Sequence, residues 1–164
     1  MTFGEFEELF GTEARTAEGV IKCLLVAAYE WFGNGNPDGA RMFGLCVPKD
    51  QLEANGAPRK SMMQDQFCKP AGKGCAKAPI PASYLGGTPA NHYTPDYATV
   101  IADDVTYKAV RINKDNERKL FVKSGGKDCA SPVLCKCNNS GIWKVFEYSS
   151  LYTGVRPDID KGDF

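Results

Sequence analysis

The sequence predicts an α+β domain in which N-terminal helices pack on a curved C-terminal antiparallel sheet. Apolar residues recur with a helical period in the first third of the chain, whereas they alternate with polar residues in short segments of the last third. The links between these last segments are short and rich in turn residues, and helices and strands do not alternate along the chain. This order is typical of an α+β domain and unlike a doubly wound parallel sheet.

Helices are expected in the first part of the chain, over residues 3–10, 16–32 and 37–46. Thr2 followed by Glu5 is a capping box, which satisfies two free backbone donors at a helix start. The second helix keeps an apolar period of 3.6 residues, and Gly33 supplies its stop. The Asn-Pro-Asp sequence at 36–38 offers a cap and a proline for the first turn of the third helix.

The middle of the chain is expected to be irregular. Residues 48–96 contain seven of the ten prolines, and only a short helix around 59–67 is expected there. After it, alternating apolar residues predict strands, with Asn-Asn-Ser-Gly as the turn of the last hairpin, over residues 97–102, 105–112, 118–123, 132–137 and 142–148.

These elements predict one domain followed by a short tail. The domain is expected to comprise a helical part (1–47), an irregular loop region (48–96) and a sheet (97–149), and to end at residue 157. Residues 158–164 are expected to be a polar tail, because their acids resemble only the first half of a calcium loop and lack its closing glutamate.

Composition excludes several classes of protein. The 164 residues carry 20 basic and 20 acidic side chains, so the net charge is zero, unlike that of proteins that bind nucleic acid or anionic membranes. No apolar run approaches the roughly 20 residues that cross a bilayer, and the acidic start is unlike a signal peptide. We therefore expect a cytoplasmic protein with no nucleic-acid partner and no membrane insertion.

The charge is nevertheless unevenly distributed. Residues 1–30 contain six glutamates against two basic side chains, a local charge of −4. Between Arg59 and Lys77 there are five basic residues and one acid, a local charge of +4. This polarity is compatible with electrostatic contact between the protein and a partner protein.

Seven cysteines make the chain cysteine-rich. In a reducing compartment we expect free thiols that act as small buried hydrophobic groups, with disulfides or a metal site as the alternatives. Cys129, Cys135 and Cys137 with a fourth ligand form the best metal set that can be assembled, but their spacing does not match the usual zinc motifs. We predict no metal and no cofactor.

Catalytic motifs are equally weak. The single histidine, His92, would have to serve as the base of a hydrolase or transferase, yet no recognisable nucleophile motif accompanies it. We therefore assign no catalytic residue. Two glycine-rich stretches, at 85–88 and 124–127, could present backbone N–H groups to an anion. Neither is a phosphate loop, and tight turns are the preferred explanation of both.

Three segments together resemble a known family. They are Tyr-Leu-Gly-Gly-Thr-Pro-Ala-Asn-His-Tyr-Thr-Pro (84–95), Val-Lys-Ser-Gly-Gly-Lys-Asp (122–128) and Trp-Lys-Val-Phe-Glu-Tyr-Ser-Ser-Leu-Tyr-Thr-Gly-Val-Arg-Pro (143–157). They resemble an uncharacterised family of small, mainly bacterial proteins for which no activity is established. The chain departs from the family at Ala90-Asn91-His92, where the family has Glu-Asn, and at Ser131-Pro132, where it has Arg-Pro. A family arginine that served an anionic ligand would be missing here.

A non-catalytic protein-interaction or assembly module is the function that we expect from these observations. It predicts that the two glycine loops lie together on one face and form the contact surface. The candidate binding residues are Gly87, Thr88, Asn91, His92, Tyr93, Ser124, Gly125, Gly126 and Asp128.

A small-ligand-binding domain is the alternative. Helices followed by an antiparallel sheet also resemble the cone-shaped nuclear-transport-factor-like fold, which encloses a pocket. The pocket would lie between helix 16–32 and the sheet, lined by Trp31, Tyr107, Phe121 and Trp143. A His92-dependent hydrolase or transferase is the third hypothesis.

Overall fold

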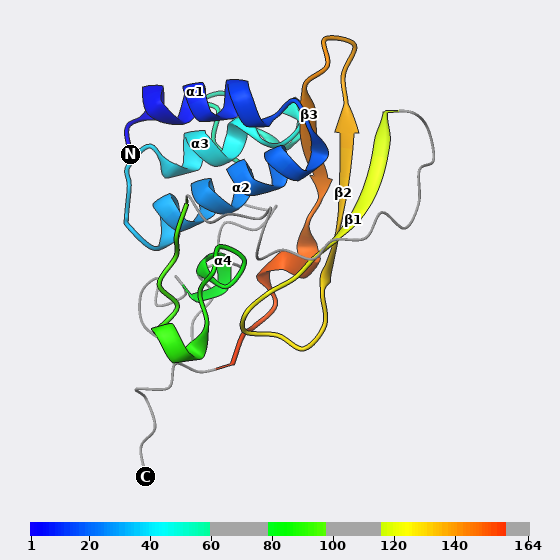
Figure 1. Cartoon of the computed structure of the whole chain (residues 1–164). Coiled ribbons are helices and arrows are strands. Elements are labelled where there is room, and N and C mark those ends of the chain that lie inside the picture. Colours follow the sequence, from blue (N-terminus) through cyan, green and yellow to red (C-terminus); the bar gives the residue numbers. More distant parts are fainter. Residues whose placement is uncertain (60–78, 98–115, 157–164) are drawn as a thin grey trace.

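Three helices pack on one side of a three-stranded antiparallel sheet (Figure 1). The structure is a computed structural model that describes residues 1–59, 79–97 and 116–156. Its main elements are α1 (Phe3–Glu13), α2 (Ala17–Phe32), α3 (Gly39–Leu45), β1 (Glu117–Val122), β2 (Ser131–Cys137) and β3 (Trp143–Glu147). Shorter turns are η1 (Lys49–Gln51), α4 (Pro79–Ala82), η3 (Pro89–Asn91) and η4 (Ser149–Tyr152). The predicted α+β class is confirmed.

Side-chain caps begin the first two helices, and the first of them is the capping box that the sequence predicts. The Thr2 hydroxyl accepts the Glu5 N–H at 3.1 Å, and Glu5 Oε2 accepts the Thr2 N–H at 3.0 Å. Thr16 caps α2 by accepting the Gly19 N–H at 2.9 Å. The first helix continues three residues beyond its predicted end at residue 10.

The third helix begins two residues later than predicted. Asn36 Oδ1 accepts the Asp38 N–H at 2.9 Å, so Asn36 closes a turn over Pro37 and Asp38 instead of capping a helix. The helix then starts at Gly39, whose backbone lies against Trp31 of α2. A Cβ on Gly39 would lie 2.4 Å from the Trp31 Cα, so close packing of α3 on α2 requires glycine here.

The sheet has the order β1-β2-β3, and its inner face is apolar. Leu120 pairs with Val133, and Cys135 pairs with Val145, in antiparallel register. These side chains are buried together with that of Val122. The alternation that predicted the strands therefore places their apolar side chains toward the helices. Each strand boundary lies within one residue of its predicted position.

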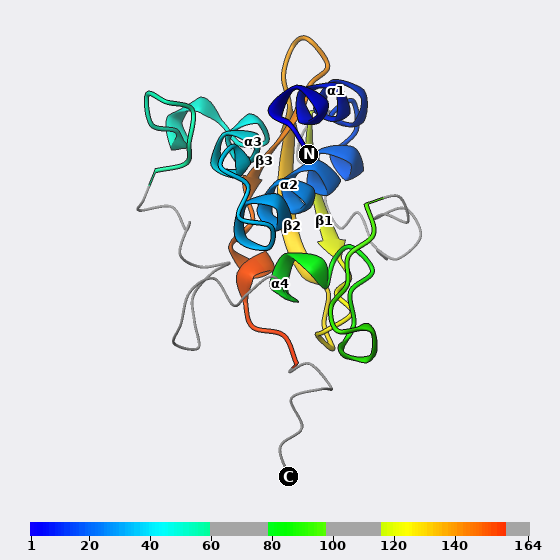
Figure 2. The ribbon, with the colours of Figure 1, turned by 90° about the vertical axis from the view of Figure 1, so that its left-hand side faces the viewer.

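The edge strand β3 is tied to the helical layer by its backbone. The Trp143 N–H donates to the Ala14 carbonyl and the Val145 N–H donates to the Cys46 carbonyl, both at 2.8 Å. These bonds satisfy donors that an open edge would expose to another chain. The 138–141 turn that joins β2 to β3 lies at the opposite end of the molecule from α4 (Figures 1 and 2).

The helix α2 forms the centre of the core. Its buried apolar side chains face α1, α3 and the sheet, and most of them have no exposed surface. No helix in the described ranges is long and apolar enough to cross a membrane. The expected helix at 59–67, the strand at 105–112, most of the strand at 97–102 and the tail at 158–164 lie outside the described residues. A cone-shaped enclosure stays a prediction.

The five described cysteines are free thiols. Cys23, Cys46 and Cys135 are buried, as expected of small hydrophobic groups, whereas Cys129 is exposed and Cys137 is half-buried. Within the described segments, no group of three metal-ligating side chains lies together. Cys135 Sγ instead lies against the Ala17 carbonyl at 3.9 Å, inside the helix–sheet interface.

We expect alkylation to separate these thiols into two classes. Burial raises the pKa of Cys23 to about 12 and raises the pKa of Cys46 and of Cys135 above the usual range, so few thiolates form at neutral pH. Iodoacetamide should label Cys129 and Cys137 in the native protein and the three buried thiols only after denaturation. Peptide mass spectrometry over a time course measures this, and equal rates at Cys129 and Cys46 would contradict it.

Candidate functional site

Two glycine loops from distant parts of the sequence lie against each other. We call residues 86–94 and 124–128 the paired loops. The Gly125 N–H donates to the Ser83 carbonyl at 2.8 Å, and a Cβ on Gly125 would lie 2.3 Å from the Gly87 carbonyl oxygen. No side chain fits into this contact, so the approach requires glycine. The prediction that these loops lie together on one face is confirmed.

The first of the paired loops is held by the Asn91 side chain. Thr88 and Asn91 form a reciprocal cap on η3, in which each side chain accepts the other residue's N–H. Asn91 Oδ1 also accepts the Thr94 N–H at 3.1 Å, and its Nδ2 donates to the Gly86 carbonyl at 2.9 Å. One amide thus joins three points of the loop, which fixes its shape.

The chain is strained at the end of this turn. His92 and Tyr93 both have left-handed backbones, with φ of 59° and 53°, a conformation that side chains other than glycine rarely adopt. His92 is exposed there, whereas Tyr93 is 3% exposed. Such residues persist only where surrounding contacts impose the conformation, and they cluster at functional positions.

Tyr93 supplies the contact that imposes it. Its ring lies over Gly126, where a Cβ would be 2.6 Å from the Tyr93 hydroxyl. That hydroxyl donates to the Arg156 carbonyl, and the Arg156 N–H donates to the Gly126 carbonyl at 2.9 Å. At the surface, Arg156 forms an ion pair with Asp128 at 2.7 Å. The paired loops and the segment after η4 therefore form one connected unit.

A buried chain of hydroxyl groups lies beneath the paired loops. Ser124 Oγ donates to Ser83 Oγ at 2.8 Å, and Ser83 Oγ donates to the Ile80 carbonyl at 2.7 Å. Ser124 Oγ also accepts the Gly126 N–H at 3.0 Å. Ser124 is only 3% exposed, so its hydroxyl supports the loop from inside and does not face solvent.

Lys127 is the group at this site that the sequence did not reveal. Its ammonium donates to the Tyr84 hydroxyl, to Thr153 Oγ1 at 2.7 Å and to the Ser150 carbonyl at 3.0 Å. The Tyr84 hydroxyl in turn donates to the Leu151 carbonyl at 2.8 Å. The second loop is thereby fastened to η4. Burial lowers the pKa of Lys127 to about 8, so the amine is still charged at neutral pH, the form that its carbonyl partners favour.

The chemistry of this cluster is restricted by burial. Lys127, Tyr84 and Ser131 are linked, with Tyr84 Oη 3.1 Å from Ser131 Oγ and Lys127 Nζ 3.3 Å from it. An amine beside two hydroxyls could activate a nucleophile in an open cleft. Here Tyr84 has no exposed surface and Ser131 is 4% exposed, so a substrate could not approach either oxygen. The arrangement is a structural cross-link.

The nine predicted binding residues divide by exposure. Asn91, His92 and Asp128 are exposed, Thr88 and Gly125 are half-buried, and the others, Gly87, Tyr93, Ser124 and Gly126, are buried. The structure brings all nine into the paired loops, but only the first three offer fully exposed side chains to a partner. The buried four determine the shape of the loops.

The predicted pocket residues are not brought together. Trp31 stacks on Phe32 near the end of α2, whereas the Trp143 N–H bonds to Ala14, just before α2 begins. An α-helix rises about 1.5 Å per residue, so the two tryptophans lie at opposite ends of α2. Phe121 lies between the buried Leu120 and Val122 and so points to the other face of β1. Tyr107 lies outside the described residues.

Comparisons with known proteins identify a family and no characterised relative. No curated protein and no solved structure matches the chain. One family model matches residues 1–158, which is nearly the whole chain and includes α1, the paired loops and the last strand. The chain therefore belongs to the family described as domain of unknown function DUF6935.

Proposed function

We propose that this protein is a non-catalytic protein-interaction module, and that its partner contacts the paired loops. The observation that carries the proposal is the pair of left-handed residues, His92 and Tyr93, held in that conformation by contacts from a second loop. Backbone strain of this kind costs about 1–3 kcal/mol per residue. A loop that served only to connect two elements could adopt an unstrained backbone and avoid this loss of stability.

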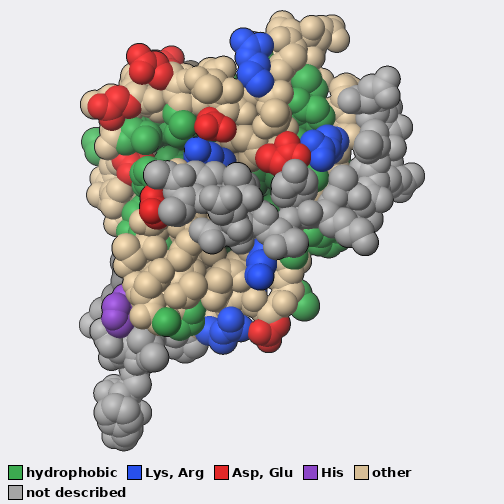
Figure 3. Space-filling view, in the orientation of Figure 1, with side chains coloured by type: hydrophobic (Ala, Val, Ile, Leu, Met, Phe, Trp, Pro, Cys, Tyr) green, Lys and Arg blue, Asp and Glu red, His purple; other side chains and the backbone are tan. Residues whose placement is uncertain are grey.

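Rigid loops favour binding because little entropy is lost when a partner docks. The paired loops are fixed by glycine contacts and by the Asn91 amide, and they display exposed polar groups at their surface. Conformational order before binding raises affinity without adding contacts. In the space-filling view, His92 lies on the exposed surface at the lower end of the molecule (Figure 3).

The buried reactive groups support a non-catalytic role. The Tyr84 and Ser131 hydroxyls beside Lys127 are buried, and the groups that Lys127 contacts are structural carbonyl and hydroxyl groups. The remaining candidate, His92, stands on the exposed tip of a turn. A His92-dependent hydrolase or transferase is the alternative hypothesis, and it would require a nucleophile positioned by the same turn.

A matched pair of arginine substitutions tests the proposal. Ala90→Arg adds a bulky cation to the exposed surface of the paired loops, and Asn139→Arg adds the same group to the exposed β2–β3 turn at the other end of the molecule. Immobilised wild-type protein and both variants are incubated with native extract, and the bound proteins are quantified by mass spectrometry. Circular dichroism melts confirm that each variant is folded.

We expect a protein that is enriched by the wild type and by Asn139→Arg and is lost with Ala90→Arg. Its purified form should then bind the wild type directly in a titration, with at least about tenfold weaker binding to Ala90→Arg. A partner retained equally by all three proteins would place the interface elsewhere. The absence of any enriched protein would contradict the proposal itself.

A further inference from the structure

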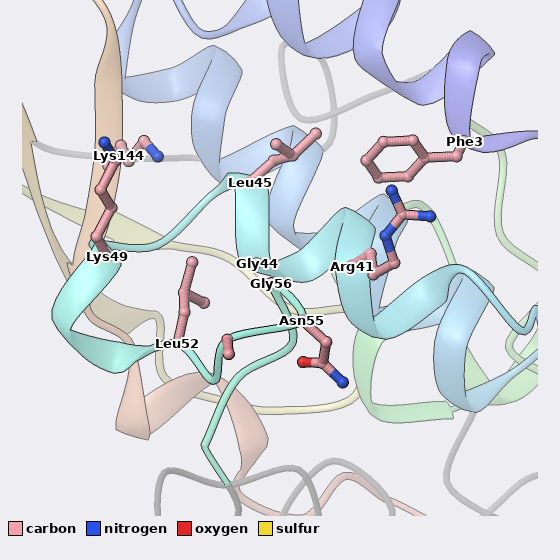
Figure 4. Close-up of a pocket in the computed structure, with 10 residues that line it drawn as sticks. Phe3, Arg41, Gly44, Leu45, Lys49, Leu52, Asn55, Gly56 and Lys144 are labelled. Carbon is pink, nitrogen blue, oxygen red and sulfur yellow. The ribbon is translucent and has the colours of Figure 1, made fainter.

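A pocket of about 370 Å³ lies among the helices, away from the paired loops (Figure 4). It is formed by α1, α3, η1, the turn at 52–58 and β3, and its lining residues include Phe3, Arg41, Leu45, Lys49, Leu52 and Lys144. Its volume is within the range of small-molecule sites, which begins at roughly 300 Å³.

One wall of this pocket is built by backbone contact. A Cβ on Gly44 would lie 1.9 Å from the Gly56 carbonyl oxygen, so α3 and the 52–58 turn touch directly. The turn is closed by the Glu53 N–H, which donates to the Ala57 carbonyl at 2.8 Å, and by the bridge between Leu52 and Pro58. The wall is therefore formed before any ligand arrives.

The charges that line the pocket have one sign. Among the described residues that line it, Arg41, Lys49 and Lys144 are cationic and none is a carboxylate. Within the described ranges neither lysine forms a salt bridge, while Arg41 lies over the Phe3 ring and 3.5 Å from Asp38. Burial, together with the nearby charge of Lys49, lowers the pKa of Lys144. An anion placed there would favour the charged form of both amines.

The apolar and charged groups occupy different parts of the pocket. Lys49 and Lys144 extend toward the same end, whereas Leu45 and Leu52 lie between them and Arg41 (Figure 4). We propose that this pocket binds a small organic acid, an apolar body with one carboxylate or phosphate group held by Lys49 and Lys144. The leucines and Phe3 cover the body, and the amines neutralise the head group.

A titration with three matched probes tests this assignment. Octanoate, octyl phosphate and uncharged octanol share one apolar chain and differ in the head group. Two-dimensional ¹⁵N–¹H spectra of the full chain report which backbone amides shift as each probe is added. We expect saturable shifts at Gly44, Leu45 and Gly56 with either acid, and at least about tenfold weaker binding of octanol. The acid that binds more tightly identifies the head group.

Removing the charges of the two amines provides a second test of the pocket. The double variant Lys49→Gln/Lys144→Gln should weaken binding of the preferred acid by about tenfold or more and leave octanol binding unchanged. Lys119→Gln removes an exposed charge from β1 and serves as the control that should bind like the wild type. Equal binding of octanol and the acids, equal binding by the double variant, or shifts confined to other residues would overturn the proposal.

Discussion

Replacing Gly19 by alanine should lower the free energy of unfolding by about 3 kcal/mol or more. Gly19 lies in the first turn of α2, and a Cβ there would be 1.8 Å from the Glu13 carbonyl oxygen and 2.6 Å from the Glu13 carbonyl carbon. Because the obstacle is backbone at the junction of α1 and α2, it cannot yield by a rotamer change. One of the two helices would have to move, and this movement would disrupt the packing of α1 on α2 in the core.

The control is another helical glycine in the same helix pair. Gly11 lies in α1 and is exposed, and a Cβ there would meet nothing within 4 Å. Gly11→Ala should therefore raise the free energy of unfolding by about 0.5–1 kcal/mol, because alanine loses less backbone entropy in a helix. Urea denaturation followed by circular dichroism measures both variants. Similar effects of the two substitutions would show that α1 and α2 do not make the close contact described.

The sequence predicts elements better than it predicts contacts between them. Thr2 and Thr16 begin helices through bonds to residues three positions away, and the 138–141 turn closes a hairpin, so all of this information is local. The predicted start of the third helix at residue 37 is wrong, because the Asn36 side chain can close a turn as readily as it can cap a helix. Gly19 offers no signal at all, since its need for glycine comes from the carbonyl of another helix.

The candidate site was predicted in outline only. The interaction-module hypothesis predicted that the two glycine loops lie together, and the structure shows their contact, but the sequence did not indicate which of their residues face outward. Ser124 is polar and yet buried, because its hydroxyl meets Ser83, 41 positions away. Lys127 likewise meets Tyr84 at a separation of 43 positions. Hydrogen-bond partners so distant along the chain cannot be recognised from a short sequence pattern.

The helix α2 contains a buried carboxylate, and its burial also could not be predicted from the local sequence. Glu30 is 2% exposed and stands in the last turns of an apolar helix. Its oxygens accept Asn34 Nδ2 at 2.6 Å, Asn36 Nδ2 at 2.9 Å and the Tyr97 hydroxyl at 2.7 Å. The N-terminal ammonium of Met1 also lies 3.2 Å from Glu30 Oε1, so one cation and three neutral donors contact the carboxylate. Together they connect α2 to the N-terminus, to the loop before α3 and to residue 97.

Removing this carboxylate should be among the most damaging single changes in the protein. Glu30→Ala leaves a cavity, and it removes the acceptor of the half-buried Asn36 and Tyr97 side chains and of Asn34. We expect the free energy of unfolding to fall by about 3 kcal/mol or more. Glu7→Ala, an exposed glutamate of α1, is the control and should change it by less than about 0.5 kcal/mol. Urea denaturation at neutral pH measures both. A loss below about 1 kcal/mol for Glu30→Ala would mean that the donors find other partners.

The pH dependence of stability separates the charge of Glu30 from its packing. Burial alone would raise the pKa of Glu30, but hydrogen bonds from Asn36, Tyr97, Asn34 and the N-terminal ammonium outweigh it and lower the pKa below the ordinary value of 4.5. The unfolded chain therefore takes up the proton first as the pH falls. The stabilisation by the carboxylate is complete above about pH 4.5 and is lost as the pH falls through the folded-state pKa.

Glu30→Gln isolates this contribution because it keeps the shape and removes the charge. The difference in free energy of unfolding between wild type and Glu30→Gln should be constant from pH 7 to about pH 5.5 and should shrink below about pH 4.5. Other carboxylates titrate in the same range, but they do so in both proteins and cancel in the difference. A difference that grows on acidification would mean that the folded protein holds Glu30 protonated, and the three donors would then have to be oriented otherwise.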